Sequence, residues 1–256
     1  MRFLITAGPT REPIDPVRYI SNRSSGKMGY AIAEAALEAG HDVILISGPV
    51  NLDPPPGVRA VSILTSDEMY DAVHRHIRDS DLLVMCAAVA DYKAQKVSAT
   101  KIKKRDEHLV LDLILTRDIL ASLPNKDRQF LVVGFAAETN DVEENAAKKL
   151  REKNCDIIVA NDISTVDSGM ESDANEVTIF FRSGEKKKIS RAPKKILARE
   201  LVKIFFTFAR KTVDKKNVMT TELGVSEVIP NSSQNLRDCG LKGGNRVDGK
   251  EKKESS

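Results

Sequence analysis

The chain of 256 residues has no tryptophan, only three cysteines and four histidines, and 5% aromatic residues. Its cysteines, Cys86, Cys155 and Cys239, are far apart, so they form neither a CxxC pair nor a disulfide framework. His74 and His76 are two residues apart, which places them on different faces of a helix. The sequence therefore does not predict a metal held mainly by histidine and cysteine, and a reducing, cytoplasmic compartment is expected.

Long apolar runs and a basic body are missing as well. No run of eighteen apolar residues occurs, and Met1 leads directly into a strand-like segment, so neither a membrane nor export is expected. Residues 209–256 carry ten Lys and Arg against seven Asp and Glu, which accounts for the whole net charge of +3. With no basic stripe and no aromatic platform in the body, nucleic acid is not an expected partner.

The end of the chain differs in composition from the rest. After Phe208 there is no aromatic residue, and Gly, Asn, Ser and Lys dominate. Such a segment cannot bury enough apolar surface to offset the entropy of ordering. We therefore expect a folded domain at residues 1–208 and a mobile or disordered tail at residues 209–256.

Within the body, apolar strand-like runs alternate with segments of helical period. The predicted strands are 2–6, 42–47, 58–63, 81–88, 130–137 and 156–161. The predicted helices are 27–39, 66–78, 116–123, 141–153 and 194–208. Because parallel crossovers need covering helices, this alternation predicts an α/β fold with a doubly wound, Rossmann-like parallel sheet of order 3-2-1-4-5-6. Residues 176–181 and 186–190 predict an antiparallel hairpin at the sheet edge.

A long loop rich in Gly, Pro, Ser and Arg is expected between the first strand and the first helix. Gly26-Lys27 is followed by Met28, which excludes a P-loop, and no acidic residue follows the second strand, which disfavours an NAD turn. The run Ser24-Ser25-Gly26-Lys27 would offer backbone N–H groups, hydroxyls and a lysine to a phosphate at the helix N-terminus. A serine N-cap with small residues for close packing explains the same run, so both interpretations stay open.

Polar residues also follow other predicted strands. Arg18 and Asn22 in the opening loop suit a carboxylate or an amide, and Asp91 after the fourth strand could hold a ribose or a metal-bound water. Lys101 and Lys103 are spaced as on one face of a strand. Solvated side chains are the simpler alternative for Arg18 and Asn22, and for Lys103 with its neighbours Lys104 and Arg105.

No nucleophile accompanied by a base is evident. The sequence lacks a Ser-His-Asp or Cys-His arrangement, so covalent catalysis by the protein has little support. Cations and amide donors around phosphates favour catalysis by positioning and charge stabilisation. This pattern is typical of phosphoryl or nucleotidyl transfer.

Five motifs carry a resemblance to a known family: GPTREPIDPVRYISNRSSGKMG, CAAVADY, KIKK, GFAAET and ANDIS. Over residues 1 to about 205 the chain resembles the phosphopantothenoylcysteine synthetases, the second half of a bacterial bifunctional flavoprotein of coenzyme A biosynthesis. The resemblance implies ligation of 4′-phosphopantothenate to L-cysteine. The carboxylate would attack the α-phosphate of CTP to give an acyl-cytidylate and pyrophosphate, and the cysteine amine would then displace CMP.

The resemblance also implies roles for particular residues. Asn22 and Arg18 match positions that hold the pantothenoyl substrate and support turnover of the acyl-cytidylate. Lys101 matches a lysine, on a flap between subunits, that is needed to form this intermediate, and Ala88 lies in the same catalytic wall. The implied nucleotide contacts are Met85, Cys86, Ala87, Asp91, Lys101, Asp118, Ile119, Phe135, Lys149 and Lys153. The expected phosphate and substrate residues are Ser24, Ser25, Gly26, Lys27 and Asn161.

The family works as a homodimer with a divalent cation, usually Mg²⁺, held mostly through phosphates, and the metal ligands stay unknown. The KIKK and AAVADY forms favour CTP over ATP. The flavin-dependent decarboxylase half is absent, so no flavin is expected, and a stand-alone synthetase with a possible separate decarboxylase partner is implied. One departure is Thr116-Arg117-Asp118-Ile119, where the family often has Asn-Pro-Asp-Ile. A nicotinamide-dependent reductase and a non-catalytic nucleotide sensor are the alternatives.

Overall fold

The computed structural model describes residues 1–104, 108–125, 128–138, 142–162 and 172–223. The chain divides into a large unit, Met1–Asp214, and a second unit, Lys215–Ser256, of which only the end of the last helix is described. Residues 224–256, most of the expected tail, thus lie outside the described residues. The predicted domain boundary near residue 208 stays a prediction.

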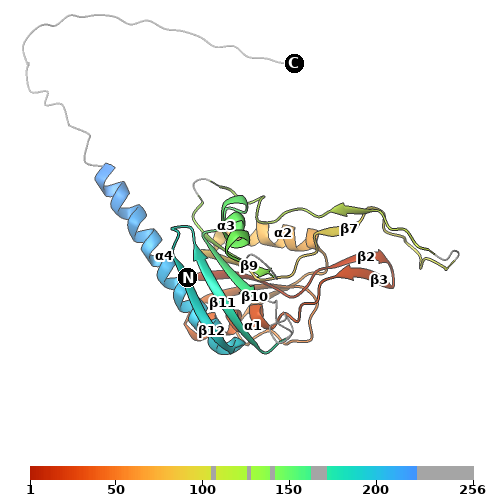
Figure 1. Ribbon diagram of the computed structural model, residues 1–256, viewed down its shortest axis with the longest axis horizontal. Helices are drawn as coiled ribbons and strands as arrows, with labels where there is room; N and C mark the ends of the chain where they lie inside the picture. The colour runs from red at the N-terminus through yellow and green to blue at the C-terminus, as the bar shows by residue number, and fades with distance from the viewer. Residues whose placement is uncertain (105–107, 126–127, 139–141, 163–171, 224–256) are drawn as a thin grey trace, which may run out of the picture. The chain divides into compact units, whose positions relative to one another are not determined.

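The large unit is built on one eight-stranded sheet flanked by helices (Figure 1). Its strands are β1 (Arg2–Ala7), β4 (Asp42–Ser47), β5 (Arg59–Ser62), β6 (Leu82–Met85), β9 (Leu131–Glu138), β10 (Ile157–Asp162), β11 (Ala174–Phe181) and β12 (Lys186–Pro193). They lie in the order β12-β11-β10-β9-β6-β1-β4-β5. The six strands β10, β9, β6, β1, β4 and β5 are parallel to their neighbours in this row, whereas β11 pairs antiparallel with both β10 and β12. Numbered as predicted, the parallel strands follow 3-2-1-4-5-6, so the fold class and the edge hairpin are confirmed.

Helices cover both faces of this sheet. They are α1 (Lys27–Glu38), α2 (Ser66–His76, continued by a 3-10 turn at Ile77–Asp79), α3 (Val142–Glu152) and α4 (Lys194–Leu223). Alternate residues of β1 point to opposite faces: Phe3 and Ile5 pack with α1 and α4, whereas Leu4 packs with α2 and α3. All three are fully buried, and each contributes about 1.5–3 kcal/mol by removing apolar surface from water. None of the described helices is long and apolar enough to cross a membrane.

The opening segment contains a hairpin where only a long loop is predicted. Strands β2 (Arg11–Asp15) and β3 (Arg18–Ser21) pair antiparallel. The Oδ1 of Asp15 accepts the N–H groups of Val17 and Arg18, each at 2.9 Å, and this side-chain turn joins the two strands. The sequence did not predict this hairpin, because the segment is rich in Gly and Pro and because its turn is formed by the carboxylate of Asp15 and not by a glycine.

A second extension lies beside this hairpin. Strands β7 (Tyr92–Ala94) and β8 (Leu113–Leu115) pair antiparallel, and we call residues 92–115 the flap, of which 105–107 lie outside the described residues. In Figure 1, β7 and the β2–β3 hairpin lie side by side beyond the sheet, and the N–H of Ser98 donates to Ile14 O at 3.0 Å. The inter-subunit role of the flap stays a prediction.

The strand-like alternation around Lys101 does not form a strand. The N–H of Ile102 donates to Asp15 Oδ2 at 3.1 Å, and its carbonyl accepts from Arg18 Nη2 at 2.7 Å. Side chains of the hairpin therefore satisfy the backbone groups that a neighbouring strand would otherwise bind.

Two predicted helices also differ from the structure. Residues 116–123 contain a turn at 119–122 and no helix: Asp118 Oδ1 accepts the N–H of Ala121 at 3.0 Å, and Pro124 has no N–H with which to continue a helix. The last helix, predicted to end near Phe208, continues to Leu223. Whether a segment is helical, and where the helix ends, depends on packing against the rest of the domain, and the apolar periodicity of the sequence does not show this packing.

Candidate active site

A cavity of about 790 Å³ lies at the carboxyl ends of the central parallel strands. Most of the predicted site residues line it: Asn22, Ser24, Gly26, Lys27, Met85, Cys86, Ala87, Ala88, Asp91, Asp118, Ile119, Phe135, Lys149, Lys153 and Asn161. Arg18, Ser25 and Lys101 are not among the lining residues. The topology thus brings together segments that follow β1, β6, β9 and β10, as expected where a parallel sheet reverses its strand order.

The N-terminus of α1 forms one wall of this cavity. The N-cap is Gly26, at φ 74° and without a side-chain cap hydrogen bond, so the interpretation of this run as a serine N-cap is wrong. A Cβ at Gly26 would come within 2.8 Å of Val50 Cγ1, and a Cβ at Gly29 within 2.6 Å of Ala7 Cβ. These glycines bring the helix start close to the end of β1, where its first N–H groups and positive dipole favour an anion.

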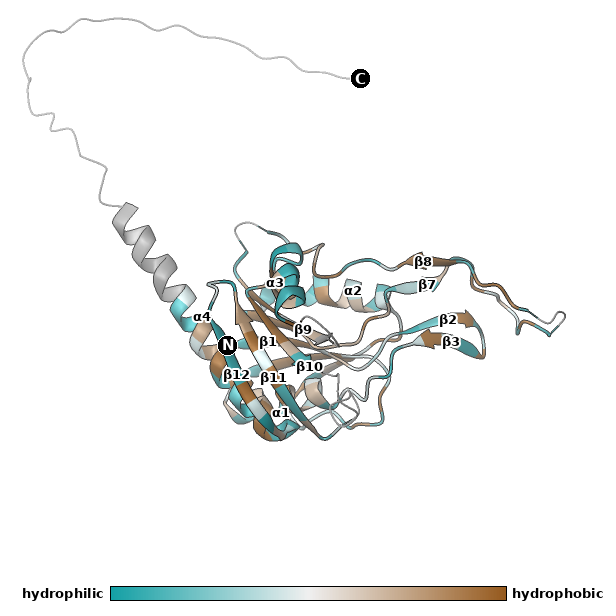
Figure 2. Cartoon of the chain, in the orientation of Figure 1, coloured by the Kyte–Doolittle hydropathy of each residue, from teal (hydrophilic) through white to brown (hydrophobic). Residues whose placement is uncertain are grey.

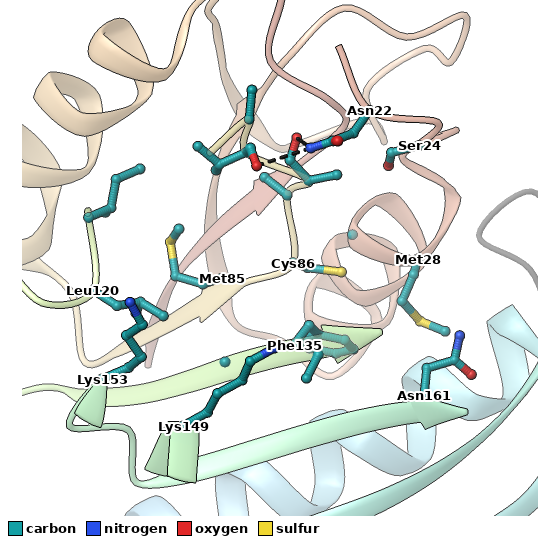
Figure 3. A pocket seen from close by; sticks show the side chains of 18 of the residues that line it. Asn22, Ser24, Met28, Met85, Cys86, Leu120, Phe135, Lys149, Lys153 and Asn161 are labelled. Atoms are coloured by element: carbon teal, nitrogen blue, oxygen red, sulfur yellow. Dashed lines mark hydrogen bonds between the residues drawn. The ribbon is translucent and has the colours of Figure 1, made fainter. Parts of the chain in front are cut away.

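Asn22 is held against the segment that follows β6. Its Nδ2 donates to the carbonyls of Ala88 and Val89 at 3.2 and 3.0 Å (Figure 3). The same segment is fixed from the other side, because Thr10 Oγ1 accepts the N–H of Ala90 at 3.0 Å and the N–H of Thr10 donates to Ala88 O at 3.2 Å. The amide oxygen of Asn22 is therefore carried on a well-supported wall next to Ala88.

Cations gather on another side of the cavity. Lys149 lies on α3, and Lys153 directly follows the last residue of this helix, with its N–H donating to Lys149 O at 2.9 Å; Lys153 also forms an ion pair with Asp118. Burial of Asp118 favours its neutral form, but hydrogen bonds from Lys153 and from the N–H of Ala121 outweigh burial and lower the pKa of this carboxyl. In Figure 3 these lysines lie on the side of Met85 and Leu120, whereas Ser24, Met28 and Asn161 lie on the opposite side.

Cys86 lies between these two sides (Figure 3). Burial raises the pKa of its thiol to about 12, although the nearby Lys194 acts in the opposite direction. A thiol with this pKa is protonated at neutral pH, so it is a poor nucleophile. The cavity is consequently suited to binding and charge stabilisation.

The lining residues that were not predicted to belong to the site include Arg117, Asn175 and Lys194. Arg117 is held by ion pairs with Asp67 at 3.0 Å and Asp71 at 3.1 Å, and it lies 3.9 Å above the ring of Tyr70. Arg117 stands where the family often has a proline, and this difference could have identified Arg117 as a residue of the site. Asn175 and Lys194 belong to the edge hairpin and the last helix, and no motif marks them.

Comparison with protein families matches residues 1–208 to the DNA/pantothenate metabolism flavoprotein C-terminal domain. This chain belongs to that family. Within the flavoprotein C-terminal family, the chain is 49% identical over 190 residues to the coenzyme A biosynthesis bifunctional protein CoaBC of Escherichia coli K12, covering 73% of this chain and 47% of that protein. It is 46% identical over 205 residues to the CoaBC protein of Vibrio vulnificus CMCP6, covering 78% of this chain and 51% of that protein.

The chain therefore spans about half the length of the curated relatives that it matches. A solved structure shares the fold over the same region: the crystal structure of the C-terminal domain of a CoaBC protein is 44% identical, with a TM-score of 0.71. That match covers 82% of this chain and 96% of the solved domain. The matched part of the relatives is thus the domain to which the described cavity belongs.

Proposed function

We propose that this chain is a phosphopantothenate–cysteine ligase, which joins 4′-phosphopantothenate to L-cysteine through an acyl-cytidylate formed from CTP. The flavoprotein C-terminal family and the coenzyme A biosynthesis of the named relatives support this activity. The observation that carries it is one cavity with a helix N-terminus on one side, a lysine pair on the other and the amide of Asn22 on its wall. Such a cavity suits two anionic substrates that must meet.

In the first step the substrate carboxylate attacks the α-phosphorus of CTP. The acyl C–O–P linkage forms while the bond from the α-phosphorus to the bridging oxygen breaks, and pyrophosphate leaves with the electron pair. Lys149 and Lys153 supply positive charge on the nucleotide side, where negative charge builds up on the leaving group. Their electrostatic stabilisation is greatest in the transition state, because negative charge is then shifting onto the leaving pyrophosphate.

In the second step the cysteine amine attacks the acyl carbon. The C–N bond forms, the bond from the acyl carbon to the cytidylate oxygen breaks, CMP leaves and the amine loses a proton. The Asn22 amide, fixed by the carbonyls of Ala88 and Val89, orients the acyl group for this attack. The protein needs no nucleophile of its own in either step.

A magnesium ion fits this cavity in the usual way for nucleotide sites. Among the described residues no group of three or more His, Cys, Asp and Glu could hold a metal by itself, but the carboxylates of Asp91 and Asp118 line the cavity. Mg²⁺ bound through substrate phosphates needs only one or two carboxylates and several waters. When bound it would neutralise phosphate charge, with Asp91 and Asp118 as the carboxylates that face it.

The proposed enzyme is a homodimer. Hydrophobic residues occur in the flap and in the β2–β3 hairpin (Figure 2). The large apolar side chains that are exposed there are Val17, Tyr19, Tyr92, Val97, Leu109, Val110, Leu113, Ile114 and Leu115. A patch of this kind is typical of a protein–protein interface. Because Lys101 does not line the cavity of its own chain, the flap of one copy would carry this lysine to the cavity of the second copy.

Pyrophosphate release tests the activity. The purified protein is mixed with Mg²⁺, 4′-phosphopantothenate and L-cysteine, CTP is compared with ATP, and each component is omitted in turn. Release with CTP that requires 4′-phosphopantothenate is the expected result. Nucleotide binding without release would favour a nucleotide sensor instead, and bound NAD(P) seen by absorbance would favour a reductase.

A further inference from the structure

Residues from the two ends of the domain meet at one corner of the cavity. Lys27 and Lys194 are the first residues of α1 and α4, and both line the cavity together with Asn175. Asp173 connects them: its Oδ1 lies 2.6 Å from Lys27 Nζ, and its carbonyl accepts the N–H of Lys194 at 2.9 Å. We call Lys27, Asp173, Asn175 and Lys194 the basic corner.

The charges of the basic corner favour an anion. Lys194 is only 6% exposed, and burial together with the charge of Lys27 lowers its pKa. The carboxylate of Asp173 acts in the opposite direction, but its side chain is 88% exposed, so water weakens its effect. A phosphate beside Lys27 and Lys194 would stabilise both ammonium groups at the N-termini of two helices.

Asn175 adds a polar group that could bind a ligand. It is 5% exposed, and within the described part of the chain its Oδ1 has no hydrogen-bond partner. A buried carbonyl oxygen without a partner is unfavourable, and a ligand hydroxyl or N–H in the cavity would satisfy it. The basic corner thus offers cations for a phosphate and an acceptor for a neighbouring donor.

The position of the corner separates it from Lys149 and Lys153. Asn175 lies two residues before Val177, and Val177 is the strand neighbour of Asn161. In Figure 3, Asn161 lies on the side of Met28 and opposite Lys153. The corner is therefore on the α1 side of the cavity, away from the side assigned above to the nucleotide.

We propose that Lys194 and Asn175 select the phosphate-bearing end of 4′-phosphopantothenate. Lys194 pairs with the phosphate monoester, and Asn175 Oδ1 accepts from the substrate hydroxyl that is close to it. This assignment rests on the proposed ligase function, which it deepens by naming two residues that distinguish the phosphorylated substrate from pantothenate.

The neighbouring lysine provides a matched control. Lys195 follows Lys194 on α4, but its side chain is 70% exposed and forms an ion pair with Glu34 at 3.1 Å. Binding of 4′-phosphopantothenate and of pantothenate to wild type, Lys194→Met and Lys195→Met is measured by calorimetry without nucleotide, and KM for both CTP and 4′-phosphopantothenate is measured in turnover. Thermal unfolding checks that each variant is folded.

We expect Lys194→Met to weaken 4′-phosphopantothenate about tenfold or more, because a charge-assisted contact is lost. Pantothenate binding and the KM for CTP should stay unchanged, and Lys195→Met should behave as wild type. If Lys194→Met keeps the wild-type preference for the phosphorylated compound, the assignment is wrong. A raised KM for CTP alone would also overturn it, because the lysine would then serve the nucleotide.

Asn175 gives a second test that does not depend on the folding of Lys194→Met. Asn175→Ala should weaken 4′-phosphopantothenate and pantothenate alike, because both carry the hydroxyl. Asn175→Asp should weaken the phosphorylated compound more, because the new carboxylate repels phosphate. Equal binding by wild type and both variants would reject the corner as a subsite.

Failure of the subsite and failure of the ligase function give different results. A wild-type protein that binds 4′-phosphopantothenate through Lys194 but releases no pyrophosphate would retain the subsite and lose the function. A wild-type protein that releases pyrophosphate, with variants that bind as it does, would retain the function and lose the subsite.

Discussion

The guanidinium of Arg18 forms a 2.6 Å ion pair with the carboxylate of Asp15, whose side chain is fully buried. Both partners also bind the residue that follows Lys101: Arg18 donates to the carbonyl of Ile102, and Asp15 accepts its N–H. Arg18, predicted to contact the substrate, thus holds the flap of its own chain. The turn of the β2–β3 hairpin is therefore a support for Lys101.

We expect Asp15→Asn to reduce formation of acyl-cytidylate about tenfold, because a catalytic group displaced by about 1 Å loses much of its effect. In this variant an amide N–H would point at the N–H of Ile102 or at the guanidinium of Arg18. Because two donors cannot form a hydrogen bond, the flap would be held less firmly. Single-turnover trapping of the intermediate measures this. Asp53→Asn, at an exposed position, is the control, and an equal loss in both variants would contradict a role for Asp15.

The pH dependence of stability gives a second measure of Asp15. Burial favours its neutral form, but hydrogen bonds from the N–H groups of Val17 and Ile102 and from Arg18 outweigh burial and lower its pKa below 3.8. A lowered pKa gives stability that is complete above pH 3.8 and is lost as the pH falls through the folded-state value. The difference in Tm between wild type and Asp15→Asn should therefore be full at neutral pH and shrink below pH 3.8.

The sheet could be predicted from the sequence because its information is local. Strands such as β4 and β10 contain continuous apolar runs, Val43–Ile46 and Ile157–Ala160, and this pattern is typical of strands that are buried on both faces. The cavity residues near these strands followed from the rule for parallel sheets, together with the family motifs. The helix predicted at 116–123 does not form, because the side chain of Asp118 accepts the N–H of Ala121, which such a helix would direct to the carbonyl of Arg117.

The rest depended on contacts between distant segments. The hairpin at residues 11–21 is closed by Asp15, and its partner in the flap lies 87 residues away at Ile102. Lys194 reaches the cavity only because β11 and β12 place the start of α4 beside α1. Neither relationship has a periodicity or a motif, so no single-sequence argument could find it.

Lys101→Gln should abolish formation of acyl-cytidylate, because the positive charge proposed to act on the nucleotide is removed. The intermediate is trapped in the absence of cysteine and compared with that of wild type. Lys103→Gln is the matched control, since Lys103 is an exposed lysine two residues along the same flap. Equal intermediate in wild type and Lys101→Gln would exclude this role.

Asn22→Asp should permit the first half-reaction and slow the second about a hundredfold, because misplacing the acyl group costs orientation. A carboxylate cannot donate to the carbonyls of Ala88 and Val89, so the side chain would leave the wall. Accumulation of acyl-cytidylate in the presence of cysteine is the expected observation. The exposed Asn51→Asp serves as control, and failure to form any intermediate in Asn22→Asp would contradict the assignment.

Removal of residues 215–256 should leave turnover nearly intact. The compact unit that contains the sheet and the cavity ends at Asp214, and every lining residue of the cavity precedes it. The truncated and full-length proteins are compared by kcat and by Tm. A large loss of kcat with an unchanged Tm would show that this segment takes part in the reaction.

The inter-subunit flap is tested by mixing two inactive variants. In a mixed dimer of Lys101→Gln and Asn22→Asp protomers, one cavity combines an intact Asn22 with an intact Lys101 from the partner, and the other cavity has neither. Random reassortment makes half of the dimers mixed, so activity should recover to about a quarter of wild type if the lysine acts on the second copy. If each lysine acts within its own chain, no cavity is restored and the mixture stays inactive. Light scattering checks that the protein is a dimer. The baseline is the activity of the two variants refolded separately and then mixed under conditions in which their subunits do not exchange.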